Sequence, residues 1–250
     1  MAKNAERVFF DANLIRGQLT TAVLLELAER RLFSPRWSQR VLGEMRDHRP
    51  DNVPAEKIDR RISEMNKAFP AAMVSGFEHH MERMQAHKGD RHVLAAAVHA
   101  KAHVLVTEND KHFSPPVTGD DAIEVERVSA FLNRYLNDHP REVIAAMEGM
   151  VARNRYEPRS MPALIDKMVT RGELAGFAHR LNAMLPAEQR GTNEKLQPSL
   201  RGQAATTKSA RSAALDGMES PQGAVDAVPK TPTPGNRPPT RPDRGRGTER

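Results

Sequence analysis

The sequence contains no cysteine among its 250 residues. Disulfide bonds, thiolate zinc sites and cysteine nucleophiles are therefore excluded. A chain without cysteine fits the reducing cytosol, where disulfides are rare. On this ground we expect a cytoplasmic protein.

Long hydrophobic runs are also missing. No segment approaches the roughly 18 consecutive apolar residues that a membrane-spanning helix needs. The opening MAKNAERVFF passes directly into a short apolar run and an acid, without the apolar core of a signal peptide. The sequence thus predicts a soluble protein with no membrane partner.

An excess of positive charge is missing from most of the chain, although the net charge is +6. Residues 191–250 hold ten Lys and Arg against six Asp and Glu, which leaves a net +2 for residues 1–190. Nucleic-acid binding by residues 1–190 would therefore need a local basic patch rather than a strong overall field.

Aromatic residues are absent from residues 191–250, which contain eight prolines. Such a segment buries too little apolar surface to offset the entropy of ordering, so we expect a disordered, Pro-rich, basic tail. Its role is open between a solubilising tail and a segment that contacts RNA or a partner.

Short apolar runs alternate with helical periodicity up to about residue 138. Strands are expected at 7–10, within 71–77, at 103–107 and at 123–126. Helices are expected at 19–32, 54–68, 79–84, 90–101 and 128–137. One further helix is expected within 31–48, with Ser34 as its N-cap and Pro35 as its first residue.

This alternation predicts an α/β fold with a parallel sheet covered on both faces. From about residue 139 only helices are expected, beginning at Pro140 and continuing through 160–171 and 173–184. We therefore divide the chain into an α/β domain over 1–138, a helical extension over 139–190 and the tail over 191–250.

Acids and amides follow the predicted strands, at the sheet edge where parallel α/β proteins bind ligands. Asp11 ends the first strand, Asp90 begins the helix before the strand HVLVT, and Glu44 lies on a helix beside apolar residues. The remaining candidates on the exit loops are Asn13, Thr107, Asn109 and Asp110.

Several carboxylates that converge on one point repel one another unless a cation lies between them. A ligand set made only of oxygen atoms favours a hard cation, Mg²⁺ or Mn²⁺. Such metal sites hydrolyse phosphodiesters by acidifying a water and neutralising phosphate charge.

Each residue alone also has an ordinary interpretation. Asp11 is equally suited to a turn, and Asp90 to an N-cap, which does not prevent it from binding a metal as well. Glu44 alone is more typical of a solvated helix surface, and Asn109 and Asp110 of a turn. No catalytic role is assigned to any of the ten histidines.

Arginines near the first two helices are usually part of a solvated face, but they are also candidates for holding RNA phosphates. The candidates are Arg30, Arg31, Arg36, Arg40 and Arg91.

Four stretches together resemble the PIN-domain family, which includes the VapC-type toxins of toxin–antitoxin pairs. They are VFFDAN, LFSPRWSQRVLGEM, GDRHVLAAAVHAKAHVLVTEND and TENDKHF. In this resemblance Asp11, Glu44 and Asp90 correspond to the first three acids of the family. The stretch NDHPREVIAAMEGM and the helices after it are similar to the C-terminal helical extension of one PIN subgroup.

The resemblance implies a three-layer α/β/α PIN-like sandwich and a Mg²⁺- or Mn²⁺-dependent endoribonuclease. The catalytic set would be Asp11, Glu44, Asp90 and Asp110, and the metal ligands would be these four with Asn109. Asn13 and Thr107 would support them. RNA would be the substrate, a cognate antitoxin protein the partner, and a homodimer a further expectation.

One departure from the family pattern affects the fourth acid, which falls at Asn109 while Asp110 follows it. Gly89 also stands where relatives carry an additional acid. Both changes reduce the negative charge of the site. Three alternatives remain: an inactive RNA- or antitoxin-binding module, which Asn109 makes possible, a nuclease that cleaves DNA with the same metal chemistry, and a structural helical protein in which the acids occur by chance.

Overall fold

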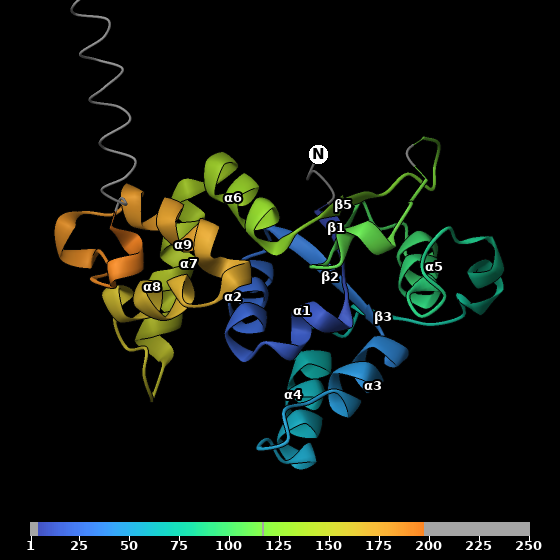
Figure 1. The fold of residues 1–250 in the computed structure, drawn as a ribbon, viewed down its shortest axis with the longest axis horizontal. Helices are drawn as coiled ribbons and strands as arrows, with labels where there is room; N and C mark the ends of the chain where they lie inside the picture. The colour runs from blue at the N-terminus through green and yellow to red at the C-terminus, as the bar shows by residue number, and fades with distance from the viewer. Residues whose placement is uncertain (1–4, 117, 198–250) are drawn as a thin grey trace, which may run out of the picture. The chain divides into compact units, whose positions relative to one another are not determined.

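The computed structural model describes residues 5–116 and 118–197, so the predicted tail lies outside the described residues from position 198 onward. The described chain forms one compact unit around a five-stranded parallel sheet (Figure 1). The strand order is β3-β2-β1-β4-β5. The strands are β1 Glu6–Phe10, β2 Phe33–Ser38, β3 Met73–Val74, β4 Val104–Val106 and β5 Glu124–Glu126.

The central strand β1 is buried because parallel strands are covered on both faces and so carry continuous apolar runs. Val8, Phe9 and Phe10 are all fully buried, and β1 pairs with β2 on one side and β4 on the other. The chain leaves β1 toward β2 and β3 and later returns to β4 and β5. The order therefore reverses between β1 and β4, which is the switch point where ligands bind in open parallel sheets.

Helices cover both faces of the sheet, as the α/β sandwich predicted from the sequence requires (Figure 1). The helix α5 lies on one side, whereas α2 and the C-terminal helices lie on the other. The first six helices are α1 Ala12–Arg16, α2 Gln18–Glu29, α3 Gln39–Asp47, α4 Ala55–Ala68, α5 Arg91–His99 and α6 Val128–Asp138. They are followed by α7 Pro140–Arg153, α8 Met161–Val169 and α9 Gly172–Met184. Short 3-10 helices are η1 Glu78–Arg83, η2 Asp110–His112, η3 Ala187–Gln189 and η4 Glu194–Leu196.

The prediction of a helix beginning at Ser34 and Pro35 was wrong, since both residues lie in β2. Phe33, Pro35 and Trp37 are buried while Ser34 and Arg36 are less so, which is the period-two pattern of a strand. Trp37 donates its backbone N–H to Ala72 on the β3 side, so the N–H that Pro35 lacks would also point to that side. There β3 pairs only with Trp37 and Ser38, and no ladder hydrogen bond is lost.

The helix after β2 begins instead at Gln39, with Ser38 as its N-cap. The Ser38 hydroxyl accepts a hydrogen bond from the Val41 backbone N–H at 3.3 Å. This cap fixes the direction of α3 as it leaves the sheet, and α3 carries Glu44 toward the ends of the strands.

The C-terminal helices pack on the sheet domain through α2 and α6. The side chain of Glu26 on α2 pairs with Arg30 at 3.5 Å and with Arg153 on α7. Thr20 on α2 also donates a hydrogen bond of 2.8 Å to Glu173 on α9. The boundaries at 138 and 190 remain a prediction, and residues 191–193 contact α8 and α9 through hydrogen bonds to Asp166 and Asn182.

No helix in residues 5–116 or 118–197 combines the length and the apolar character that crossing a membrane requires.

Candidate metal site at the ends of the parallel strands

Asp11 lies at the carboxyl end of β1, beside the switch point of the sheet. Its side chain is only 3% exposed. One carboxylate oxygen accepts the Ala12 backbone N–H at 2.6 Å, and the other accepts the Thr107 hydroxyl at 2.7 Å. Thr107 follows β4, so the two strands at the switch point hold this carboxylate between them.

The carboxyl group of Asp11 has a raised pKa, and burial is the main cause. The hydrogen bonds from Thr107 and Ala12 oppose this shift, while the negative charges of Asp90 and Glu44 add to it. Among the residues that the structure describes, Asp11 forms no ion pair that would offset its charge. A buried carboxylate with two acidic neighbours and no cation is suited to receive one.

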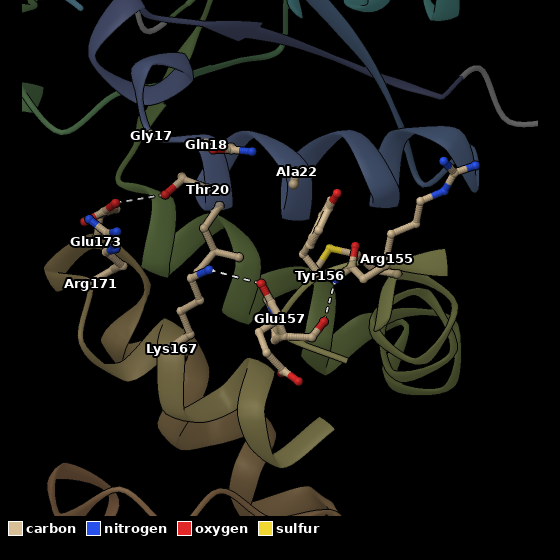
Figure 2. Close-up of a pocket in the computed structure, with 14 residues that line it drawn as sticks. Gly17, Gln18, Thr20, Ala22, Arg155, Tyr156, Glu157, Lys167, Arg171 and Glu173 are labelled. Carbon is tan, nitrogen blue, oxygen red and sulfur yellow. Dashed lines mark hydrogen bonds between the residues drawn. The ribbon is translucent and has the colours of Figure 1, made fainter. Parts of the chain in front are cut away.

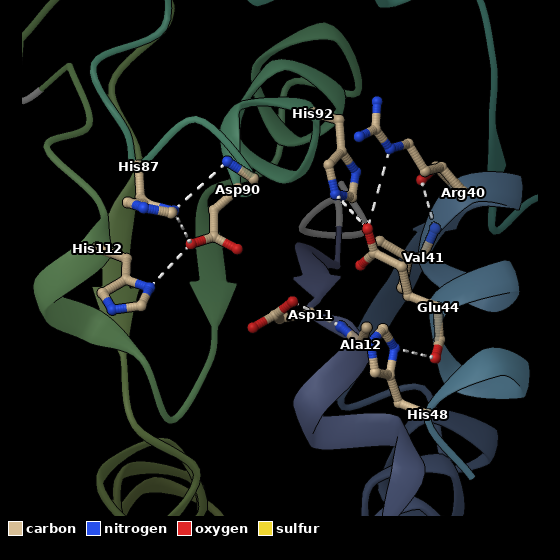
Figure 3. Close-up of polar contacts among 12 residues, drawn as sticks. Asp11, Ala12, Arg40, Val41, Glu44, His48, His87, Asp90, His92 and His112 are labelled. Carbon is tan, nitrogen blue, oxygen red and sulfur yellow. Dashed lines mark hydrogen bonds and ion pairs between the residues drawn. The ribbon is translucent and has the colours of Figure 1, made fainter.

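Asp90 reaches the same region from the start of α5 (Figure 3). It occupies the N-cap position, but its side chain makes no capping hydrogen bond, so the expectation that it caps the helix through its carboxylate was wrong. The carboxylate instead accepts a hydrogen bond from His112 Nδ1 at 2.8 Å and lies 3.8 Å from His87 Nδ1. These contacts turn Asp90 away from the helix end and toward the exit loop of β4.

Glu44 approaches from α3 on the other side of Asp11 (Figure 3). Its carboxylate lies 2.8 Å from Nε2 of His92, which is 1% exposed, and 3.9 Å from Nε of Arg40. The His92 contact is close but poorly aligned, since neither ring nitrogen makes a hydrogen bond within the described chain. The contact therefore does not fix the orientation of the Glu44 carboxylate.

Asp11, Glu44 and Asp90 surround one region, but their carboxylates are not in close contact with one another. Their carboxylate oxygens are not all within 4.8 Å of one another in the part of the chain that the structure describes. The all-oxygen donor set of Asp11, Glu44 and Asp90 fits a hard divalent cation such as Mg²⁺ or Mn²⁺.

The remaining predicted site residues differ in whether they lie close to Thr107, the hydrogen-bond partner of Asp11. Asn109 lies next to Thr107, and its backbone N–H donates to the Thr107 hydroxyl at 3.0 Å. Asp110 instead forms an ion pair of 3.0 Å with Arg127. The structure therefore brings the Asn109 backbone to Thr107 and directs the Asp110 carboxylate to the start of α6. Asn13 lies on α1, two residues from Asp11, and is partly buried.

The arginine candidates do not form one patch. Arg40 and Arg91 are exposed beside Glu44 and Asp90. Arg30 and Arg31 precede β2 and so lie toward the opposite edge of the sheet from the acids. Arg30 also donates to the Ala145 carbonyl of α7 at 2.8 Å.

Arg36 lies within β2 and donates to the Pro35 carbonyl at 2.8 Å. Its pKa is lowered by burial and by the charge of Arg7.

The histidine partners of the acids were missed from the sequence. His92 and His112 each contact one predicted acid, although no role was assigned to either. The available signal was the position of His92 within DRHV, two residues after Asp90. His112 lies 22 positions from Asp90 and meets it only in the folded chain.

A cavity of about 330 Å³ lies elsewhere, between α2 and the C-terminal helices (Figure 2). Thr20, Tyr156, Lys167 and Glu173 are among its lining residues, and none of the predicted acids is. The cavity is separate from the acids at the ends of the strands.

The sequence is similar to that of a curated protein of Mycobacterium tuberculosis (strain ATCC 25618 / H37Rv) named "Putative ribonuclease VapC50". The two are 33% identical over 122 residues, which cover 46% of this chain and 68% of the relative. No family model and no solved structure matches the chain. The similarity covers more than two thirds of the relative, and with the fold described above it shows that this chain belongs to the VapC family of PIN-like proteins.

Proposed function

We propose that this protein is a Mg²⁺- or Mn²⁺-dependent endoribonuclease and the toxin of a toxin–antitoxin pair. The observation that carries the proposal is Asp11, a carboxylate buried at the switch point with Asp90 and Glu44 as acidic neighbours and no ion-pair partner in the described chain. Membership of the VapC family supports the same activity.

Asp11, Glu44 and Asp90 would hold the divalent cation, with Asn109 as a neutral further ligand. When bound, the cation would supply a more acidic water and neutralise charge on the scissile phosphate. Thr107 keeps the Asp11 carboxylate in one orientation through its 2.7 Å hydrogen bond. His112 does the same for Asp90, so both are positioning residues.

RNA is expected as a single strand or an exposed loop, because the narrow major groove of an RNA duplex is closed to side chains. Arg40 and Arg91 are exposed beside the acids and would contact phosphates. An antitoxin would cover the same edge of the sheet, and a basic side chain inserted beside Asp11 would supply the missing positive charge.

The experiment is cleavage of a structured RNA by purified protein in Mg²⁺, in Mn²⁺ and in EDTA. Asp11→Asn is prepared identically, and Asp138→Asn serves as the matched control because Asp138 is an exposed acid at the end of α6. Cutting that needs metal, disappears in Asp11→Asn and persists in Asp138→Asn supports the nuclease. Equal cutting by all three proteins would contradict it. A DNA strand of the same sequence, tested beside the RNA at equal salt, shows which nucleic acid is preferred.

The toxin role has a separate test in cells. Expression of the wild-type chain should arrest growth, and expression of Asp11→Asn should not. Arrest by both proteins would mean that the effect does not arise from the acids.

A second candidate is an RNA- or antitoxin-binding module with little activity. Two observations favour it: the fourth acid position holds Asn109, and the neighbouring Asp110 is engaged by Arg127. RNA binding that persists in EDTA, with no cleavage in either metal, would select this candidate.

A further inference from the structure

Three histidines from two separate segments gather at the far end of α5. His79 and His80 lie on η1, and His99 is the last residue of α5. Each offers a ring nitrogen, and these three nitrogens all lie within 4.8 Å of one another. Across residues 5–116 and 118–197 it is the one group of three or more His, Asp or Glu residues that meets this criterion.

Packing brings the two segments together but does not require three histidines. The segment η1 packs against α5, and its core contacts come from the partly buried Met81 and from Phe77 and Met84 on either side of it. His99 is exposed at the end of a helix whose residues 92–98 are all buried. The three rings nevertheless lie close, with centroids 4.0 Å apart for His79 and His80 and about 5.5 Å from each to His99.

The chemistry of the group suits a transition-metal ion. Imidazole nitrogen is a preferred ligand of Zn²⁺, and three histidines with one open position form a common zinc arrangement. Two nitrogens bound to one tetrahedral Zn²⁺ lie roughly 3.4 Å apart, given bonds of about 2.0–2.1 Å. Small rotations of the exposed His79 and His99 side chains and of the partly buried His80 would close the remaining gap. The helix end also favours a cation, because the carbonyl groups at a helix C-terminus carry partial negative charge.

We propose that His79, His80 and His99 form a binding site for Zn²⁺, separate from the acids that would hold Mg²⁺ or Mn²⁺. The site lies at the opposite end of α5 from Asp90, roughly 14 Å along a helix of this length. It does not depend on the proposed nuclease activity. Bound Zn²⁺ would connect η1 to the end of α5 by direct ligation.

Arg83 controls access to this site. Its Nη2 lies 2.7 Å from His80 Nδ1 and, since arginine only donates, Nδ1 accepts and the ring proton is on Nε2. The pKa of His80 is lowered by burial first and then by the charges of His79, Arg83 and His99, with Asp121 acting in the opposite sense. A lowered pKa favours the neutral imidazole, which is the form that binds a metal. Ligation through Nδ1 would displace Arg83, and ligation through Nε2 would require the proton to move to Nδ1.

The test is Zn²⁺ titration of the full chain without an affinity tag, after removal of metals with a chelator. Excess Mg²⁺ is present throughout to occupy the acids. We expect one saturable Zn²⁺ per chain, and a loss of affinity of at least about tenfold in His99→Gln and in His80→Gln, because even a group that only supports a metal ligand costs 10–100-fold when removed. His179→Gln is the matched control, since His179 is exposed on α9 and away from the cluster. Its affinity should equal that of the wild type.

Arg83→Gln tests the contact between Arg83 and His80 Nδ1. Removing a competing donor and a positive charge should tighten Zn²⁺ binding. Absence of saturable binding, equal affinity in His99→Gln and wild type, or loss of binding in Asp11→Asn instead would each overturn the proposal. Melting temperatures in EDTA establish that the variants are folded, and they should lie close to that of the wild type because none of the three rings is fully buried.

Discussion

Asp11 and Glu26 are both buried carboxylates on the same domain, and their surroundings differ in one respect. Glu26 is 5% exposed and pairs with two arginines, one on its own helix and one on α7. Asp11 is 3% exposed and receives two neutral hydrogen bonds, while the charges of Asp90 and Glu44 raise its pKa further.

The contrast indicates that Glu26 stabilises the fold, whereas Asp11 is positioned to bind a ligand. Burial of a charge is tolerated where a partner of opposite sign offsets it, as at Glu26. At Asp11 no positive charge of the described chain offsets the buried carboxylate, and an external cation would do so. Buried groups with perturbed pKa values of this kind are concentrated at functional sites.

The largest effect should be on RNA cleavage, when each of the two carboxylates is replaced by an amide in turn. Asp11→Asn should reduce RNA cleavage at least about 100-fold, since it removes a metal-ligand charge where loss of a supporting contact alone costs 10–100-fold. Glu26→Gln should leave cleavage per folded molecule unchanged, because it lies in the α2–α7 contact. Initial rates in Mn²⁺, normalised to the folded fraction, measure both. A comparable loss of activity in both variants would remove the distinction.

Stability should respond in the opposite order. Glu26→Gln leaves Arg30 and Arg153 with a neutral partner, and we expect the free energy of unfolding to fall by about 1–3 kcal/mol, limited by the solvent exposure of both arginines. For a domain of this size each kcal/mol lowers the melting temperature by about 2–4 °C. Asp11→Asn should lower it less than Glu26→Gln does in EDTA, because the amide removes a buried charge, which offsets the loss of one of the two hydrogen bonds that the carboxylate accepts. Thermal melts in EDTA measure both variants. Destabilisation by Asp11→Asn alone would mean that Asp11, and not Glu26, stabilises the fold.

The sequence identified these acids because their positions follow from local order. Asp11 ends an apolar run and Asp90 begins a helix before the next strand, so a parallel sheet must bring them to the same edge. Their partners could not be found in this way. His112 meets Asp90, and Arg127 meets Asp110, across distances in sequence that only the folded chain closes.

The error at β2 has a different cause. Ser34 and Pro35 carry the local signs of a helix start, but the alternating burial of Phe33, Pro35 and Trp37 against β1 determines the strand. Tertiary packing overrode a local preference there. The proline is accepted because β3 is short, a fact about a neighbouring strand that the residues around Pro35 do not encode.

A smaller effect should distinguish the two candidates for the fourth ligand. Asn109→Asp adds a carboxylate beside Thr107 and should tighten Mn²⁺ binding by about tenfold, equivalent to about 1.4 kcal/mol. Asp110→Asn should leave Mn²⁺ binding unchanged, because Arg127 already holds that side chain away from the acids. Calorimetric titration measures both variants. The reverse ranking would show that Asp110 is released from Arg127 to serve as the ligand.

The smallest effect is the dependence of metal-free stability on pH. Because the pKa of Asp11 in the folded chain is raised above its ordinary value of 3.8, the native state binds this proton more tightly than the unfolded state does. As pH rises from 3.8 to the raised pKa of Asp11 in the folded chain, deprotonation therefore lowers the free energy of unfolding of the wild type. Glu108 and Glu126 also have pKa values raised by burial, so the informative quantity is the difference between wild type and Asp11→Asn.

In EDTA the melting temperature of Asp11→Asn minus that of the wild type should increase as pH rises from 3.8, and it should level off once Asp11 is ionised. Excess Mn²⁺ should reduce or reverse the difference, because a cation beside Asp11 stabilises the charged form that burial disfavours. Glu26→Gln provides the comparison, since its partners are arginines already in place and its melting temperature should not respond to Mn²⁺ beyond the response of the wild type. A difference that stayed constant with pH would mean that water or an unseen contact already compensates Asp11, and the distinction between the two buried carboxylates would then rest on their hydrogen bonds alone.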